Sequence, residues 1–124
     1  MEFSIKYANG LFELNTTGAV TPSGYDHLYN VLTTHENWRP GSLVLSDEKS
    51  VDTSKLSTDD IIAIADLSRK YKREYGNAKI TTLAHAKVTY GINRMWGVHS
   101  DLHWDAEVMV FRDREDALAW LSAE

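Results

Sequence analysis

Apolar and polar residues alternate at the start of the chain. Residues 3–7 read Phe-Ser-Ile-Lys-Tyr, and a period of two is typical of a half-buried strand. Asn9-Gly10 follows, a dipeptide that favours the tight turn of a two-residue hairpin. Residues 11–16 then read as the returning strand. The pattern predicts that the chain begins with a β-hairpin.

Helical spacing replaces this alternation in two long segments. Thr21 can cap a helix and Pro22 suits its first position, since the missing N–H costs nothing there. Ser57 and Asp60 resemble a capping box that begins a second helix, which ends at Gly76-Asn77. The apolar faces are Tyr25, Leu28, Val31 and Leu32 in the first helix, and Ile61, Ile64, Ala65, Ser68, Tyr71 and Tyr75 in the second.

Short apolar runs separate and follow these helices. They predict strands over residues 43–45, with polar Ser46-Asp47 at the end, over 79–84 and over 108–111. A helix is expected over 88–95. A last helix begins at Asp113, with Ala117, Leu118, Trp120 and Leu121 as its apolar face. The order β-β-α-β-α-β-α-β-α predicts an α/β fold with a mixed, mainly parallel sheet of about five strands.

Composition and charge narrow the class of protein. The 124 residues are 43% hydrophobic and 25% charged, as expected for one globular domain over 1–124. The net charge is 13 minus 18, or −5, which argues against general binding to nucleic acid. The sequence has no cysteine, no signal-peptide pattern and no apolar run of about 20 residues. We therefore expect a cytoplasmic location, no integral membrane segment and no disulfide.

Two C-terminal segments carry a family resemblance. Residues 110–121, VFRDREDALAWL, resemble the last strand and helix of SpoIIAA-like, or STAS-like, bacterial proteins. Residues 90–96, YGINRMW, resemble their YG-x-x-RMF segment, with Trp96 in place of Phe. The strand over 43–47 resembles the family strand that ends in Asp before the second helix. The order of elements agrees, so the resemblance covers nearly the whole chain.

The resemblance implies a binding or regulatory role. STAS domains are mostly protein-interaction modules, and structural relatives of the CRAL-TRIO type hold lipids or other apolar molecules. Anti-sigma-factor antagonists of this family carry a phosphorylatable serine in an Asp-Ser-Ser/Thr-Gly turn. Residues 46–54 read SDEKSVDTS and lack that turn, which puts a phosphoswitch in doubt.

Several side chains are candidate ligand contacts. Tyr90 and Arg94 lie one helical turn apart, and an Arg guanidinium can hold a carboxylate or phosphate; packing and an internal ion pair are the alternative. Asp47 ends a strand where α/β sheets place ligand sites; a cap of the next turn is the alternative, and the more common role for such a residue. Aromatic and thioether side chains that could line a pocket or interface, or simply fill the core, are Met95, Trp96, Trp104 and Met109.

A metal site finds little support. His99 and His103 have a spacing that can bind zinc on a helix, but the residues between them do not look helical. We expect no metal and no cofactor. The sequence also lacks a nucleophile elbow and a phosphate-binding loop, so we expect no enzyme.

We therefore interpret the chain first as a STAS-like module that binds a protein partner. The alternative is a carrier of a small apolar or amphipathic molecule, such as a fatty acid, held between the sheet and helices that bear Tyr25, Leu28, Ile61, Ile64, Met95 and Trp96. An uncharacterised enzyme is a third possibility. A homodimer is compatible with an exposed edge strand.

Overall fold

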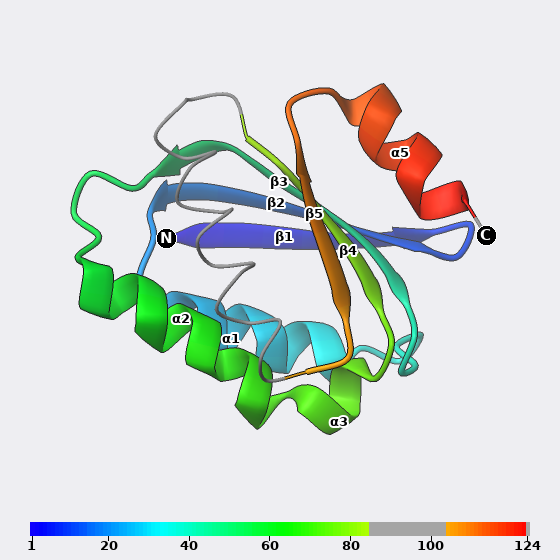
Figure 1. Ribbon diagram of the computed structural model, residues 1–124, viewed down its shortest axis with the longest axis horizontal. Coiled ribbons are helices and arrows are strands. Elements are labelled where there is room, and N and C mark those ends of the chain that lie inside the picture. The colour runs from blue at the N-terminus through cyan, green and yellow to red at the C-terminus, as the bar shows by residue number, and fades with distance from the viewer. Residues whose placement is uncertain (85–103, 124) are drawn as a thin grey trace.

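Five strands form one mixed sheet in the computed structural model, which describes residues 1–84 and 104–123. The strands lie in the order β1-β2-β3-β4-β5 (Figure 1). β1 (Glu2–Ala8) and β2 (Leu11–Ala19) form the expected antiparallel hairpin, and all other neighbours are parallel. The α/β class and the mainly parallel sheet are confirmed. The helix expected over 88–95 lies outside the described residues.

Helices cover both faces of this sheet. α1 (Pro22–Thr33) and α2 (Thr58–Lys70) pack on one face, and α5 (Arg114–Ser122) packs on the other (Figure 1). Alternate residues of β3 (Leu43–Asp52) point to opposite faces, so Val44 joins the α1/α2 core and Leu45 joins the α5 core. The remaining elements are the short helix α3 (Lys72–Tyr75) and the strands β4 (Lys79–Leu83) and β5 (Glu107–Phe111).

The predicted helix starts are present. Thr21 Oγ1 accepts a hydrogen bond from the Gly24 amide at 3.0 Å, and Pro22 occupies the first turn. Ser57 and Asp60 form a reciprocal capping box, with each side chain 3.0 Å from the other residue's amide. These caps determine where α1 and α2 begin.

Removing the Ser57 cap should destabilise the fold. Ser57→Ala leaves the Asp60 amide without its acceptor, and we expect the free energy of unfolding to fall by about 1 kcal/mol. Urea denaturation at neutral pH measures the change. Ser50→Ala, on an exposed residue of β3, is the matched control and should differ little from the parent protein.

Some elements differ from their sequence-based expectations. β3 extends to Asp52 because it pairs with β2 as far as Ala19. The second helix is interrupted at Tyr71, so α2 and α3 are separate. In α1 the buried face is Leu28, Tyr29 and Leu32, whereas Val31 is 36% exposed.

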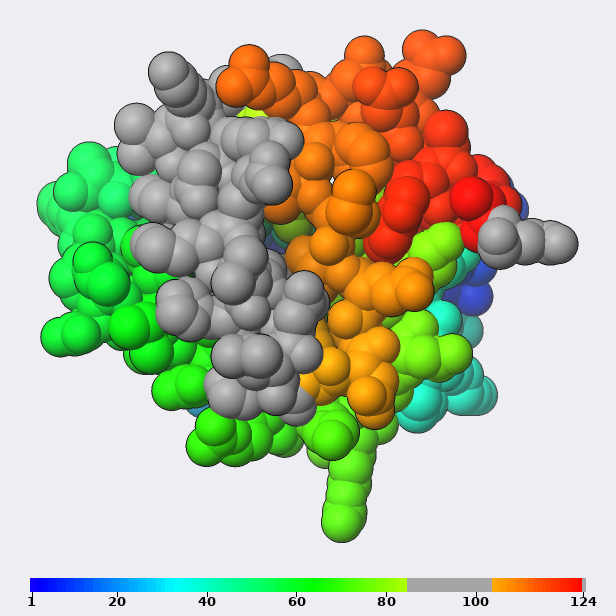
Figure 2. Space-filling model, viewed as in Figure 1, coloured from blue at the N-terminus to red at the C-terminus, as the bar shows by residue number. Residues whose placement is uncertain are grey.

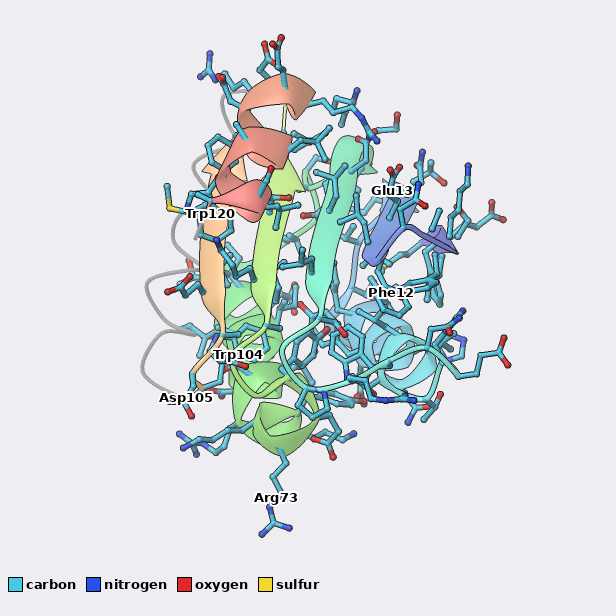
Figure 3. The ribbon with its side chains drawn as sticks, turned by 90° about the vertical axis from the view of Figure 1, so that its right-hand side faces the viewer. Phe12, Glu13, Arg73, Trp104, Asp105 and Trp120 are labelled. Atoms are coloured by element: carbon cyan, nitrogen blue, oxygen red, sulfur yellow. The ribbon has the colours of Figure 1, made fainter. Side chains whose placement is uncertain are left out.

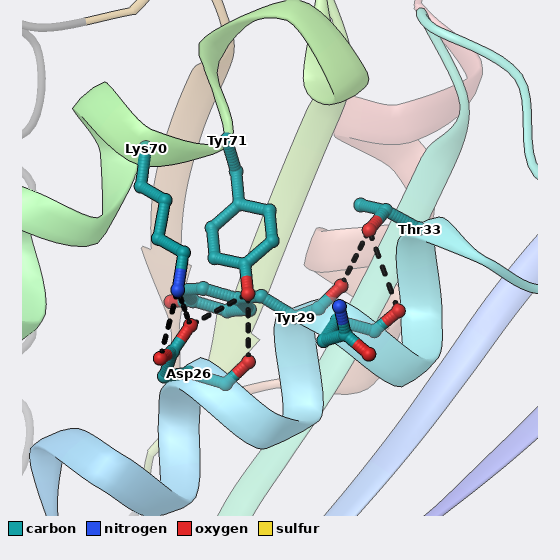
Figure 4. Close-up of polar contacts among 6 residues, drawn as sticks. Asp26, Tyr29, Thr33, Lys70 and Tyr71 are labelled. Carbon is teal, nitrogen blue, oxygen red and sulfur yellow. Dashed lines mark hydrogen bonds and ion pairs between the residues drawn. The ribbon is translucent and has the colours of Figure 1, made fainter.

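The interruption at Tyr71 coincides with a polar contact between α1 and α2 (Figure 4). The Tyr71 hydroxyl lies 2.6 Å from Asp26 Oδ1, and Lys70 Nζ lies 2.9 and 3.0 Å from the two Asp26 oxygens. The hydrogen bond from Tyr71, and then that from Lys70, lower the pKa of Asp26. This cluster fixes α1 against the end of α2.

Asp26→Asn should weaken that contact in a pH-dependent way. Because the folded-state pKa of Asp26 is lowered, ionised Asp26 stabilises the fold at pH values above the pKa of this carboxyl group in the unfolded chain. This stability is lost as the pH falls through the folded-state pKa. Because Asp26 is partly exposed, we expect a loss of only about 1 kcal/mol at neutral pH. Urea titrations should show the two proteins converging in acid. An equal difference at all pH values would contradict this account.

The end strands of the described sheet are β1 and β5. β5 (orange) reaches the surface beside α5 (red) in Figure 2, and its Met109 is 44% exposed. Pairing with a second copy through either strand stays a prediction.

Candidate functional site

A β-bulge in β3 shapes the candidate site. Pairing with β2 passes from Asn15↔Asp47 to Thr17↔Ser50, so β3 has one extra residue there. The Lys49 amide donates to Asp47 Oδ1 at 3.0 Å across the bulge. A bulge redirects the side chains around it. Ordinary strand alternation turns Glu48 to the α1/α2 side, and the bulge then places Val51, rather than Ser50, on that same side.

Glu48 is a buried carboxyl group. Glu48 is only 5% exposed. The Tyr25 hydroxyl of α1 donates a hydrogen bond to Glu48 Oε1. Burial raises the pKa of Glu48 to about 7; the Tyr25 hydrogen bond opposes this shift, and the charge of Asp47 adds to it. Glu48 therefore exchanges its proton near neutrality, unlike an exposed glutamate.

The tyrosines beside Glu48 remain protonated. Burial, followed by the charge of Glu48, raises the pKa of Tyr25 far above its usual value. The same two causes raise the pKa of Tyr29. Their hydroxyls are thus stable hydrogen-bond donors at every physiological pH.

Glu48 lies in the wall of a narrow, mainly apolar cavity between the sheet and the helices. The volume of the cavity is about 50 Å³. All the empty space between its walls, including open solvent at the mouth, comes to about 670 Å³. The apolar lining is Leu14, Val20, Leu28, Val44, Val51, Leu56, Ile61, Ile64 and Ile80; the polar groups are on Tyr25, Tyr29, Ser46, Glu48, Thr53, Tyr75 and Thr82. We call this space the Glu48 cavity.

Asp47 lies on the other face of the sheet. It lines a polar groove with Lys6, Glu13 and Arg114, beside the start of α5. Arg114 Nη2 and Glu13 Oε1 form an ion pair of 2.6 Å across this groove. The structure therefore separates Asp47 from the Glu48 cavity by the thickness of the sheet.

Trp104 is part of the α1/α2 core. It is 6% exposed, and its ring centroid lies 4.8 Å from that of Tyr75, just before β5 (Figure 3). Trp120 is half-buried on α5, with Lys79 Nζ 4.6 Å from its ring centroid. The other candidate residues, Tyr90, Arg94, Met95, Trp96, His99 and His103, lie outside the described residues, so their proposed roles stay predictions.

The described part of the chain holds neither a metal-ligand cluster nor a membrane-spanning helix. Residues 1–84 and 104–123 contain no group of three His, Asp or Glu side chains placed to hold a metal ion. No helix within these residues is long and apolar enough to cross a membrane.

Comparisons with known proteins place the architecture. No protein-family model matches the sequence, and no curated protein matches it. Among solved structures, an uncharacterised DUF3478-family protein from Shewanella loihica with a SpoIIAA-like fold is similar over 97% of this chain and 92% of its own, at 18% identity and a TM-score of 0.62. An anti-sigma factor antagonist from Mycobacterium paratuberculosis is similar over 98% and 94%, at 13% identity and a TM-score of 0.62.

The chain has a SpoIIAA-like fold. At these identities the similarity concerns the fold alone. Within this SpoIIAA-like fold, the segment that lacks the Asp-Ser-Ser/Thr-Gly turn is strand as far as Asp52, with Ser50 exposed. The Glu48 cavity lies on the face that α1 and α2 cover.

Sequence reasoning missed Glu48 although a signal was present. Val44, Ser46 and Glu48 follow a period of two, and all three are buried on the same face. The strand that the sequence predicts ends with the apolar run and the polar pair Ser46-Asp47, so it does not include Glu48. Tyr25, Leu28, Ile61 and Ile64, which were expected to face a pocket between the sheet and the helices, do line the cavity.

Proposed function

We propose that this protein is a non-enzymatic binding module that holds a small, mainly apolar molecule in the Glu48 cavity. The observation that carries the proposal is a buried carboxyl group, hydrogen-bonded to Tyr25, in the wall of an otherwise apolar cavity. Ligand sites typically combine apolar walls with a few convergent polar groups. A small ligand in this cavity is thus favoured over a protein partner.

The energetics of Glu48 support a role beyond packing. A buried carboxyl group adds little to stability compared with an apolar side chain of similar volume. Its pKa is raised mainly by burial, so the folded state favours the protonated form, and ionisation of Glu48 lowers the stability of the fold. Strongly shifted groups of this kind cluster at functional sites.

The same groups argue against covalent catalysis by Tyr25. A nucleophile is activated by a lowered pKa or by a base that removes its proton. Burial and the charge of Glu48 instead raise the pKa of Tyr25, so Tyr25 is not activated by a lowered pKa. We therefore assign the pair to binding.

The shape of the cavity limits the ligand. Its interior is small, about 50 Å³, and suits a single alkyl chain better than a fused ring system. Val51 and Leu56, both half-buried in the cavity wall, are the side chains that a longer ligand would displace.

Extraction of the purified protein tests this function. Protein never exposed to detergent is extracted with organic solvent and the extract is analysed by mass spectrometry, with Ile64→Phe and Ile62→Phe as a matched pair on α2. Ile64 is 6% exposed and lines the cavity, whereas Ile62 is 38% exposed. We expect a small apolar molecule from the parent protein and from Ile62→Phe, and much less from Ile64→Phe. Equal yields from all three would contradict a site in this cavity.

A second candidate function is regulation through a protein partner. The similarity to an anti-sigma factor antagonist favours it. Cross-linking in the source cells would capture such a partner, and exposed Ile62 on α2 offers a contact. Capture that is lost with Ile62→Asp but retained with Glu48→Gln would support this function over the first.

A further inference from the structure

The Glu48 cavity presents a carboxyl group and hydroxyl groups, but no cation from its described residues, to a ligand. None of its described lining residues is Lys, Arg or His, and Glu48 is the one carboxyl group among them. A carboxylate or phosphate ligand would therefore meet a buried acid with no compensating positive charge from these residues. Such an arrangement is costly in a low-dielectric interior.

Glu48 also has unused capacity for hydrogen bonds. Tyr25 is its only donor among residues 1–84 and 104–123, while a carboxylate accepts at about four lone-pair positions. Each buried acceptor that lacks a donor costs about 1–3 kcal/mol. A donor supplied by a ligand would remove this cost.

A second polar group at the bulge is also unsatisfied. Thr16 of β2 is completely buried, and its Oγ1 has no hydrogen-bond partner within the described residues. It lies between Asn15 and Thr17, which pair on either side of the bulge that holds Glu48. Buried polar atoms in native proteins are generally paired, so Thr16 is a second polar group, beside the bulge, that no described residue satisfies.

We infer that the Glu48 cavity selects amphipathic molecules whose head group donates a hydrogen bond, namely a primary amine or a hydroxyl on an unbranched alkyl chain. This inference rests on the proposed function, since it names the chemistry of the ligand for the same cavity. The head group donates to Glu48 beside Tyr25, and the alkyl chain lies against Leu28, Ile61 and Ile64. It differs from the fatty acid that the sequence suggested, because the head group is a donor.

The protonation of Glu48 makes the preference depend on pH. Among the described residues, the titratable groups around it are Tyr25 and Tyr29 from α1, Tyr75 from α3 and Asp47 on β3, whereas β2, β4 and α2 contribute only apolar or hydroxyl side chains to the cavity. The tyrosines stay neutral because burial raises the pKa of each. An alkylamine should therefore bind more tightly as Glu48 ionises, and an alkyl carboxylate should bind less tightly.

Calorimetric titration with three matched probes tests the inference. Octylamine, 1-octanol and octanoate share one chain and differ in the head group; each is titrated at about pH 6 and about pH 8, on either side of the Glu48 pKa of about 7. At the higher pH we expect octylamine and octanol to bind at least about tenfold more tightly than octanoate, a difference of about 1.4 kcal/mol. Glu48→Gln should cost octylamine about tenfold in affinity, while Glu36→Gln, on an exposed residue, should leave it unchanged.

The outcomes separate the two proposals. Octanoate binding as tightly as octylamine at the higher pH, or unchanged octylamine affinity in Glu48→Gln, would overturn the donor head group while leaving a ligand cavity in place. Failure of all three probes to bind would overturn both. Binding of octanol without octylamine would support the inference in its hydroxyl form. The comparison between probes on the parent protein keeps the test decisive if Glu48→Gln does not fold.

Discussion

Replacing Glu48 with glutamine is expected to remove most of the loss of stability that the protein undergoes between about pH 5 and about pH 8. The folded-state pKa of Glu48, about 7, lies above the unfolded value of 4.5. Protonated Glu48 therefore favours the folded state; this stability is complete below the unfolded pKa and is lost as the pH rises through the folded pKa. A shift of this size corresponds to about 3 kcal/mol.

The experiment compares urea unfolding of Glu48→Gln and the parent protein across this pH range. As the pH rises across this range, the unfolding free energy of Glu48→Gln minus that of the parent protein should increase by about 3 kcal/mol. Glutamine keeps an oxygen that can accept from Tyr25, so the hydrogen bond does not confound the comparison. Glu36→Gln controls for charge alone and should follow the parent protein. Parallel curves for Glu48→Gln and the parent would show that Glu48 is solvated.

Tyr75→Ala is expected to give the largest loss of stability, about 3–5 kcal/mol. Tyr75 is 1% exposed, and its ring centroid lies 5.7 Å from that of Tyr29, 5.2 Å from Trp38 and 4.8 Å from Trp104. Truncation would leave a void among three large rings and would open one wall of the Glu48 cavity.

Chemical denaturation measures this loss, with Tyr75→Phe as the matched variant. Phenylalanine keeps the ring and removes only the hydroxyl, so we expect a change within about 1 kcal/mol. Similar losses in the two variants would show that the hydroxyl, rather than ring packing, stabilises this part of the core.

Local signals in the sequence account for most of the fold. The Asn9-Gly10 turn, the Thr21-Pro22 start and the Ser57 capping box each depend on residues within a few positions of one another, and the structure contains all of them. The alternation of strands and helices then determines a mainly parallel sheet. The break between α2 and α3 was not predictable, because Tyr71 contacts Asp26, 45 residues earlier in the chain.

The candidate site shows the same division between local and long-range information. Asp47 was the predicted site residue of this strand, yet its neighbour Glu48 faces the cavity, since adjacent residues of a strand point to opposite faces. The bulge that redirects the chain after Glu48 exists only in the pairing of β3 with β2. No pattern within residues 43–52 specifies that register.

The most direct test of the site is a carbon-13 NMR titration of the Glu48 side-chain carboxyl, run without and with octylamine. We expect a midpoint near the folded-state pKa of about 7 in the free protein, and a lower midpoint when the amine is bound, because a bound cation favours the ionised form. A midpoint near 4.5, the ordinary value for glutamate, unchanged by octylamine, would contradict the proposal that Glu48 is the buried polar group of a ligand cavity.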